Sequence, residues 1–481
     1  MPVDPDLTRR RFLLAALATA LAACADRIDP TPRPLRSPSP TVAGPSPSST
    51  TSPPPVALPA SPQTSPTPPP SRAPTATPPG PTTRRLYRDG ALADGSSERV
   101  RVGVSILVED GLISWIRPSD GEEDPGPRRG LEVIDASGAT FVPGMVDAHS
   151  HLTMPGGAHW IDRGLDSPAT AIRVAERNGR LLTSAGVRWA RDVGAPRGVD
   201  PEDGRDRALS LGVRDRWAAS GQRSLPHIRA AGTWLTRAGS LPADLTVEVR
   251  DADQLLAAAE RQLDHGADLV KLYLDGPDPG TAPWSANEVR RVVRMAHDHG
   301  AQVTAHAGRL AGARAAVAGG VDAIEHGYEL DRDLAADMAR RGTFLVSTLA
   351  VFRSWLTFGR TTRLATFRGD GAAAISGRLE RAEQSVALAA RAGVPIAAGT
   401  DFGGGSLRAN QLAWEVEALV AAGLEPFEAL RAATRTGGAL LGEPDAGVIR
   451  EGGPADFFLV HGDPLESPRV LWRVWRVDWD D

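Results

Sequence analysis

The chain is poor in two reactive residue types. Among its 481 residues there is one cysteine, Cys24, so no disulfide bond can form within the chain and the fold must rest on its core. There is also one lysine, Lys271, although lysine and arginine together number 54. The formal net charge is only -5, with both signs mixed along the sequence. This balance gives no reason to expect a nucleic-acid partner.

The single lysine is the first candidate reactive group. A coding bias that replaces lysine by arginine spares a position only where a guanidinium cannot act, and chemistry on a deprotonated amine is the clearest such case. Lys271 lies in the apolar, β-prone run "GADLVKLYLDG", where an unpaired ammonium is costly. A neutral buried amine can capture CO2 as a carbamate that bridges two metal ions. We therefore predict a functional Lys271 and not a chance survivor on the surface.

The first 24 residues are typical of an export signal. The start "TRRRFL" contains twin arginines, which suggest the Tat route, and it leads into an apolar run shorter than the roughly 20 residues that cross a bilayer. Leu21 to Cys24 resemble a bacterial lipobox, in which Cys24 becomes the lipidated N-terminus. We expect a lipoprotein on the outer face of a bacterial cytoplasmic membrane, held by its lipid anchor only. The alternative is an ordinary signal peptide with an incidental cysteine.

Residues 25–84 are dominated by proline, serine and threonine, with almost no aromatic or branched apolar side chains. Such a segment cannot bury enough surface to offset the entropy of chain ordering, so we predict a disordered linker. In a polyproline conformation, some 50 residues would reach up to about 150 Å.

The rest of the chain alternates short apolar segments with Ala/Arg/Leu-rich helical stretches. The predicted strands cover residues 141–148, 187–193, 227–231, 268–274, 302–305, 321–325, 343–349 and 395–400. The predicted helices cover residues 167–185, 252–265, 286–299, 309–318, 331–341, 372–392 and 407–422. Eight βα units in series predict a (β/α)8 TIM barrel, whose chemistry lies at the C-terminal ends of the strands.

Polar residues with metal-binding side chains stand at those strand ends. In "VDAHSHL", His149 and His151 face the same way because strand side chains alternate, so the two can bind one metal ion. The ends of predicted strands four, five, six and eight carry Lys271, His306, His326 and Asp401. These residues supply the ligands for two divalent ions about 3.5 to 4 Å apart. The remaining histidines are expected to be structural or solvent-facing: His159, His227, His265, His297, His299 and His461.

Several motifs together resemble the amidohydrolase superfamily in its binuclear form with a carboxylated lysine, most closely the imidazolonepropionase-like and prolidase-like branch. They include "VIDASGATFVPGMVDAHSHL", "AHDHGAQVTAHAG", "GVDAIEHGYEL", "AGVPIAAGTDFG" and "GVIREGGPADFFLVHGDPL". The resemblance implies that strands before and after the barrel combine into a small, discontinuous β-sandwich. The expected domains are β-sandwich at 85–142, barrel at 143–443 and β-sandwich again at 444–481.

The same resemblance implies a division of roles within the centre. His149, His151 and Asp401 would hold the more buried ion, and His306 and His326 the more exposed one. The carbamate of Lys271 and a hydroxide would bridge both ions, and Asp401 would accept the proton of that hydroxide and pass it to the leaving group. Zinc is the expected metal, and Mn or Co would satisfy the same nitrogen and oxygen ligands.

The substrate is expected to be a small molecule, and the rim loops suggest only a few contacts to it. Tyr273 and Tyr328 follow Lys271 and His326 closely. Prolidase-like relatives are expected to carry a carboxylate-binding histidine after strand three, where this chain reads "TWLTRAGSLP". Arg237 in that segment could bind a carboxylate instead, or be a solvated loop arginine.

Three functions remain open from the sequence alone. The first is hydrolysis of a small amide, peptide or cyclic amide. The second is a lactonase, esterase or phosphotriester hydrolase on the same centre. The third is a non-catalytic metal-binding surface lipoprotein, which would be expected to have lost a ligand or Asp401. That loss is not seen in the sequence.

Overall fold

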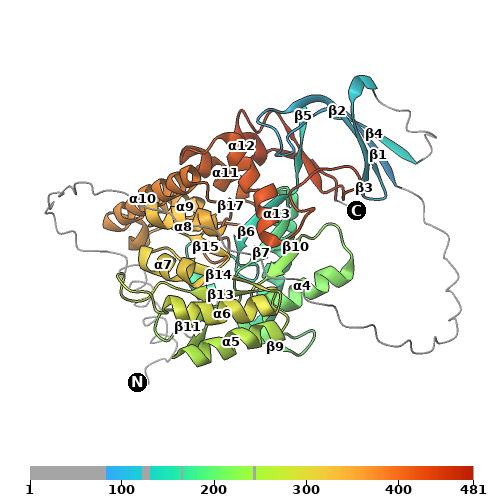
Figure 1. Cartoon of the computed structure of the whole chain (residues 1–481). Helices are drawn as coiled ribbons and strands as arrows, with labels where there is room; N and C mark the ends of the chain where they lie inside the picture. The colour runs from blue at the N-terminus through green and yellow to red at the C-terminus, as the bar shows by residue number, and fades with distance from the viewer. Residues whose placement is uncertain (1–82, 122–129, 164–165, 242–244, 480–481) are drawn as a thin grey trace, which may run out of the picture. The chain divides into compact units, whose positions relative to one another are not determined.

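A computed structural model describes residues 83–121, 130–163, 166–241 and 245–479, drawn as coloured ribbon in Figure 1. The predicted export signal, Cys24 and nearly all of the predicted linker lie outside these described residues. Within the described part of the chain, no helix is long and apolar enough to cross a membrane.

The eight strands of the predicted (β/α)8 barrel run parallel, three in one sheet and five in a second sheet that also contains two short strands (Figure 1). They follow one another along the chain as β6 (Met145–Ser150), β7 (Val187–Asp192), β10 (His227–Ala230), β13 (Leu269–Tyr273), β14 (Gln302–Ala307), β15 (Ala323–His326), β16 (Phe344–Ser347) and β17 (Ile396–Ala398). Between β10 and β13, the amide of Asp268 donates to the carbonyl of Ala230 at 2.8 Å. Beyond β17, the amide of Asp401 donates to the carbonyl of His149 at 2.8 Å, which joins the last strand to the first.

Helices follow the strands and cover them. They are α2 (Trp160–Arg163), α3 (Pro168–Ser184), α4 (Leu209–Ser220), α5 (Ala252–Asp264), α6 (Ala286–Asp298), α7 (Leu310–Gly319), α8 (Arg332–Arg341), α9 (Leu349–Thr361), α10 (Asp370–Ala392), α11 (Leu412–Ala421), α12 (Pro426–Ala432) and α13 (Arg435–Leu441). Local signals fix several ends: Ser285 and Glu288 form a capping box on α6, and left-handed Gly320 and Gly342 end α7 and α8. All seven predicted helices are present. The sequence analysis did not predict α2, α4, α9, α12 or α13, and the last predicted helix begins at Leu412, not at residue 407.

The first predicted strand, residues 141–148, was wrong as a single element. It is two strands, β5 (Ala139–Pro143) and β6, which belong to different sheets and meet at Gly144. A Cβ on Gly144 would lie 2.6 Å from the Cβ of Arg188, so only glycine allows the chain to pass so close to β7.

A seven-stranded sheet stands beside the barrel. Its strands are β1 (Arg84–Leu92), β2 (Arg101–Glu109), β3 (Leu112–Pro118), β4 (Leu131–Asp135), β5, β18 (Phe457–His461) and β19 (Val474–Val477). Both β4 and β5 pair with β1, on either side of a register shift near Gly90. The core of this sheet contains three rings packed edge to face, Tyr87, Phe141 and Phe457, with ring centroids 5.3 to 5.9 Å apart. Strands from before and after the barrel thus share one small core, as predicted.

The side chains inside the barrel change from apolar to metal-binding along the barrel axis. One apolar cluster joins Val146 and Ala148 to Ala323, Val346 and Ala397, with Leu440 of α13 packed against them. The pairing of β6 with β7 shifts register between Asp147 and Ser150. A shift of this kind re-aims the side chains that follow it. Beyond the shift, His149 at the end of β6 and His151 just after it face the site instead of continuing the apolar set.

Short elements in the connections complete the chain: β8 (Arg197–Val199), β9 (Asp206–Ala208), β11 (Leu235–Arg237), β12 (Val247–Val249) and the 3-10 turns η1 (Ser119–Gly121), η3 (Ala365–Phe367) and η4 (Pro468–Trp472).

Candidate metal centre

Three predicted ligands form a tight group at the C-terminal end of the barrel. Asp401 Oδ1 lies 3.4 Å from His149 Nε2 and 3.2 Å from His151 Nε2. The ligand atoms of these three residues lie within 4.8 Å of one another, and no other such group occurs among the described residues. Atoms that share a tetrahedral ion at about 2.0 to 2.1 Å lie roughly 3.3 Å apart. The spacing therefore fits one divalent ion.

The other ring nitrogen of each of these histidines is anchored. His149 Nδ1 lies 2.7 Å from a carboxylate oxygen of Glu325, and His151 Nδ1 lies 2.7 Å from the carbonyl oxygen of Gly194. Because these acceptors require a proton on Nδ1, they leave Nε2 as the ligand atom on both rings. Trp234 packs against His151, with ring centroids 5.0 Å apart, and further restrains that imidazole.

A second pair of histidines lies beside the first group. The rings of His306 and His326 are 4.6 Å apart, and His326 is also 4.6 Å from His149. His326 Nδ1 lies 2.8 Å from Thr348 Oγ1, whereas His306 Nε2 lies 3.2 Å from Asp275. The atoms left to bind an ion are therefore Nε2 of His326 and Nδ1 of His306. The His306 side chain is 22% exposed against 1% for His149, in line with a more accessible second ion.

Lys271 lies in the interior next to these ligands and is only 2% exposed. Its Nζ has no hydrogen-bond partner within the described part of the chain. Burial lowers the pKa of this amine to about 8, against the opposing pull of Glu325. An orphaned buried amine is costly, and carboxylation would replace it by oxygen atoms that can bind metal ions. The donor set and the orphaned Nζ together fit a binuclear centre.

A buried network under the ligands was missed by the sequence analysis. Glu325 is fully buried and accepts hydrogen bonds from Arg191 Nη2 at 2.6 Å, from Thr304 Oγ1 and from His149. Arg191 also donates to the carbonyl of Ala148 at 2.7 Å. Burial alone would raise the pKa of Glu325, but Arg191 and Lys271 hold it well below its usual range. The motif "IEHG" displays the acid, whereas its partners come from β6, β7 and β14 and could not be paired from the sequence.

Two ligands stand on strained backbone. His326 has a φ of 74° and Asp401 a φ of 53°, in the left-handed region that non-glycine residues seldom adopt. Such strain persists where the surroundings over-determine it, and it gathers at functional sites. Here it turns the two side chains from the ends of β15 and β17 into the centre.

Of the three predicted substrate contacts, two lie beside the candidate ligands and one makes other contacts. Tyr273 stacks on His306 at 4.1 Å, and Tyr328 lies 5.2 Å from His326 and packs on Phe352 of α9. Arg237 is exposed, but its Nη1 donates to the carbonyl of Pro283 at 2.6 Å and its guanidinium covers Trp284. The two tyrosines thus border the ligands, whereas the fold already provides other contacts for Arg237.

The histidines expected to be structural lie elsewhere or make other contacts. His297 pairs with Asp322 at 3.0 Å, His299 Nδ1 bonds the Met295 carbonyl, and His461 stacks against Trp475. None belongs to the ligand group found among the described residues.

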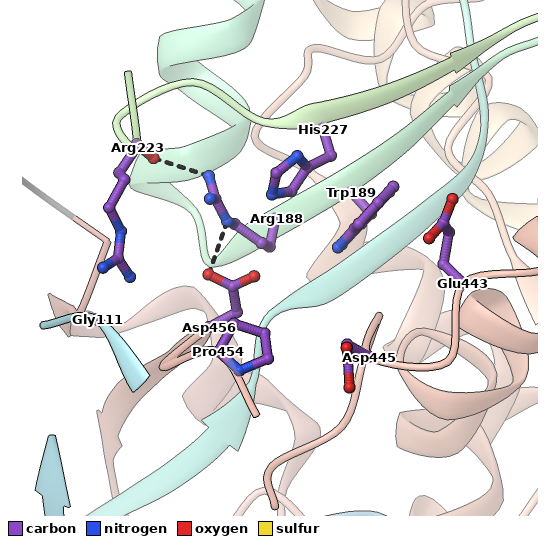
Figure 2. Close-up of a pocket in the computed structure, with 9 residues that line it drawn as sticks. All are labelled: Gly111, Arg188, Trp189, Arg223, His227, Glu443, Asp445, Pro454 and Asp456. Carbon is purple, nitrogen blue, oxygen red and sulfur yellow. Dashed lines mark hydrogen bonds and ion pairs between the residues drawn. The ribbon is translucent and has the colours of Figure 1, made fainter. Parts of the chain in front are cut away.

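A separate cavity of about 310 Å³ lies at the N-terminal ends of the strands, where the barrel meets the small sheet (Figure 2). Its walls include the stacked Trp189 and His227, which start β7 and β10. Arg188 is paired with Asp456 at 2.9 Å, and Glu443 is paired with Arg229 outside the cavity. Its charged groups are thus largely neutralised, and none of the six predicted metal ligands lines it.

Comparison with known proteins agrees with this geometry. The model of the amidohydrolase family matches residues 140–477. An uncharacterized protein of Mycobacterium tuberculosis (strain ATCC 25618 / H37Rv) is 31% identical over 380 residues, which cover 77% of this chain and 91% of that protein. Imidazolonepropionase of Salinispora arenicola is 27% identical over 78% of this chain and 89% of its own. Ochratoxinase of Aspergillus niger is 29% identical over 248 residues, about half of each chain.

Solved structures give the same fold. An Xaa-Pro dipeptidase with methionine bound in its active site superposes with a TM-score of 0.68 at 24% identity, covering 82% of this chain and 97% of that one.

Proposed function

Because the chain belongs to the amidohydrolase family and is thereby an enzyme of that family, we propose that it hydrolyses a carbon–nitrogen bond of a small molecule with the help of two divalent ions. The proposed ligands are His149, His151, Lys271 as its carbamate, His306, His326 and Asp401. Zinc is the proposed metal.

One observation carries this proposal. All four imidazoles at the C-terminal rim have one ring nitrogen anchored by a protein oxygen, which leaves the other nitrogen for a metal ion. Metal-ligating histidines almost always show this arrangement. His297 and His299 are anchored in the same way but lie outside the group at the rim, so it is the gathering of four anchored rings that supports the proposal. Four anchored rings around an orphaned buried amine speak against a surface protein that only once bound metal.

The protein's own groups supply positioning and proton transfer. When bound, the ions would lower the pKa of water to near neutrality and polarise the substrate carbonyl. Asp401, held by His149 and His151, would accept the proton of the attacking water and deliver it to the departing nitrogen. Tyr273 and Tyr328 would border the substrate on the side of His306 and His326.

The relatives support the choice of bond. An imidazolonepropionase, an ochratoxinase and an Xaa-Pro dipeptidase are among the proteins to which this chain is similar. Lactones, other esters and phosphotriesters could be cleaved at a centre of the same kind, so they form the competing arms of the test.

The test is a substrate screen with a matched variant. Purified protein loaded with zinc and bicarbonate would be assayed on N-acyl amino acids, dipeptides, cyclic amides, lactones and phosphotriesters. We expect turnover in an amide class, and we expect Asp401→Asn to lower kcat by about 10² to 10⁴. Because only one ligand of several changes, this variant should keep most of its metal. Turnover confined to lactones or phosphotriesters would replace the amide proposal, and absence of bound metal would remove the centre itself.

A further inference from the structure

The loop after β17 brings a glycine against the first ligand group. Gly403, Gly404 and Gly405 follow Asp401, and the amide of Gly405 donates back to the Asp401 carbonyl at 2.8 Å. This tight turn lays the backbone of Gly404 beside the imidazole of His151.

A side chain at Gly404 would collide with the ring of a predicted ligand. Its Cβ would overlap Cδ2 of the His151 ring and would lie 2.5 Å from His151 Nε2 and 2.9 Å from Asp401 Oδ1. These two ligand atoms face each other at 3.2 Å. Because the shortest contact is with the ring itself, a methyl group here would displace the His151 imidazole, and with it the ligand atom Nε2.

Backbone conformation does not explain the glycine. Gly403 has a φ of +84° and needs glycine, but Gly404 and Gly405 lie outside the left-handed region. A Cβ on Gly405 would meet only ordinary or slightly tight contacts, at 3.1 Å from the Asp401 carbonyl oxygen and 3.4 Å from Asp401 Oδ2. The two adjacent glycines thus differ in one respect, which is the space that a methyl group would take.

We propose that Gly404 is a positioning residue that leaves room for the His151 imidazole in the group formed with His149 and Asp401. It acts through its lack of a side chain, so a methyl group at this position displaces the ring and weakens binding of the cation at this group while the chain still folds. The inference rests on the metal-dependent function proposed above, and it adds a determinant that contributes no ligand atom.

The experiment compares full-length wild type with Gly404→Ala and Gly405→Ala. Each protein is stripped with a chelator and reconstituted with Zn2+ and bicarbonate, and its ion content and zinc affinity are measured. Circular dichroism and the apo-protein Tm report folding. Wild type and Gly405→Ala should bind two ions. Gly404→Ala should lose one ion or bind it roughly 100-fold or more weakly, beyond the usual effect of altering an outer-shell partner.

A second pair of variants covers the case in which Gly404→Ala does not fold. His151→Ala removes the ring that the new methyl group would overlap. In this background, Gly404→Ala should weaken the residual zinc binding by His149 and Asp401 no more than Gly405→Ala does, because no ring is left to displace, and a further loss specific to Gly404→Ala would overturn the inference.

The outcomes separate the two proposals. Wild type that binds no divalent ion overturns the proposed function and this inference with it. Wild type with two ions and Gly404→Ala with two ions of equal affinity overturns the inference alone. Equal loss in Gly404→Ala and Gly405→Ala also overturns it, because the effect would then belong to the loop and not to the overlap with His151.

Discussion

At the scale of single residues, the hydrogen bond at one nitrogen of each candidate histidine decides which nitrogen is left to bind a metal ion. Glu325 and the Gly194 carbonyl set which nitrogen of His149 and His151 is left to bind an ion. Thr348 and Asp275 do the same for His326 and His306, with the ring reversed in His306. Lys271 differs, because its Nζ has no hydrogen-bond partner in the described structure. The proposed carbamate would give this position a partner from outside the polypeptide.

Lys271 therefore offers a direct test of the carbamate. Lys271→Arg keeps the positive charge but cannot be carboxylated, so the variant should lose the binuclear centre and its turnover. Lys271→Ala should also fail, but a short carboxylic acid that supplies the missing bridge should restore part of both. Ion content per chain and kcat are the measurements. His297→Ala, which alters an exposed imidazole paired with Asp322, serves as control and should keep both ions. A fully active Lys271→Arg with two ions would end the carbamate hypothesis.

The chemical role of a residue could be predicted from the sequence only where it depended on residues nearby in the sequence. The pair His149 and His151 and the lone lysine stand out by type and spacing. The structure brings the two histidines together with Asp401 and buries Lys271. The network of Glu325 with Arg191 and Thr304 joins strands far apart in the sequence, so no periodicity could reveal it. The register shift in β6 was equally hidden, because it depends on pairing with β7.

At the scale of elements, the junction between β16 and α9 supports the second histidine pair. Glu415 of α11 is fully buried and accepts a hydrogen bond from Ser347 Oγ at 2.6 Å and another from the Ala350 amide at 2.7 Å. These residues flank Thr348, which anchors His326. The helix α9 was missed because it follows its strand after a single residue, so the two patterns merged into one apolar stretch.

Glu415 gives a prediction for stability against pH. Burial raises its pKa from 4.5 to about 7. The unfolded chain therefore releases this proton near pH 4.5, whereas the folded protein holds it to about pH 7, so stability falls as pH rises through that window. Glu415→Gln has no proton to release. The unfolding free energy of wild type relative to this variant should thus fall by roughly 3 kcal/mol between pH 4.5 and pH 8. Urea unfolding across this range checks it, and a difference that does not change with pH would contradict it.

At the scale of the whole molecule, structure built from contacts between residues close in the sequence could be predicted, whereas pairing between distant segments could not. The barrel could be predicted because each βα unit repeats a local alternation, and its closure needs only the return of β17 to β6. The small sheet pairs Ala139–Pro143 with Phe457–His461, more than 300 residues apart, and only the family resemblance suggested that pairing. Its strand β5 also adjoins the first barrel strand without a loop, which is why the two were predicted as one.

The last prediction concerns how the molecule is held in place. The lipobox-like Cys24 and the twin arginines lie outside the described residues, so their role stays a prediction from the sequence. The Tat route suits an enzyme that folds and takes up its metal before export. Two acyl chains anchor a protein stably whereas one binds membranes only marginally, so we expect a diacylated Cys24 as the mature N-terminus.

Cys24→Ala should release the protein from the membrane fraction or leave it unprocessed, as seen by fractionation and mass spectrometry of the N-terminus. Changing Arg9 and Arg10 to lysine should block export and leave the protein in the cytoplasm. Normal processing of Cys24→Ala together with retention in the membrane fraction would rule out the lipid anchor. The prediction of an export signal would then remain without that of a lipid anchor.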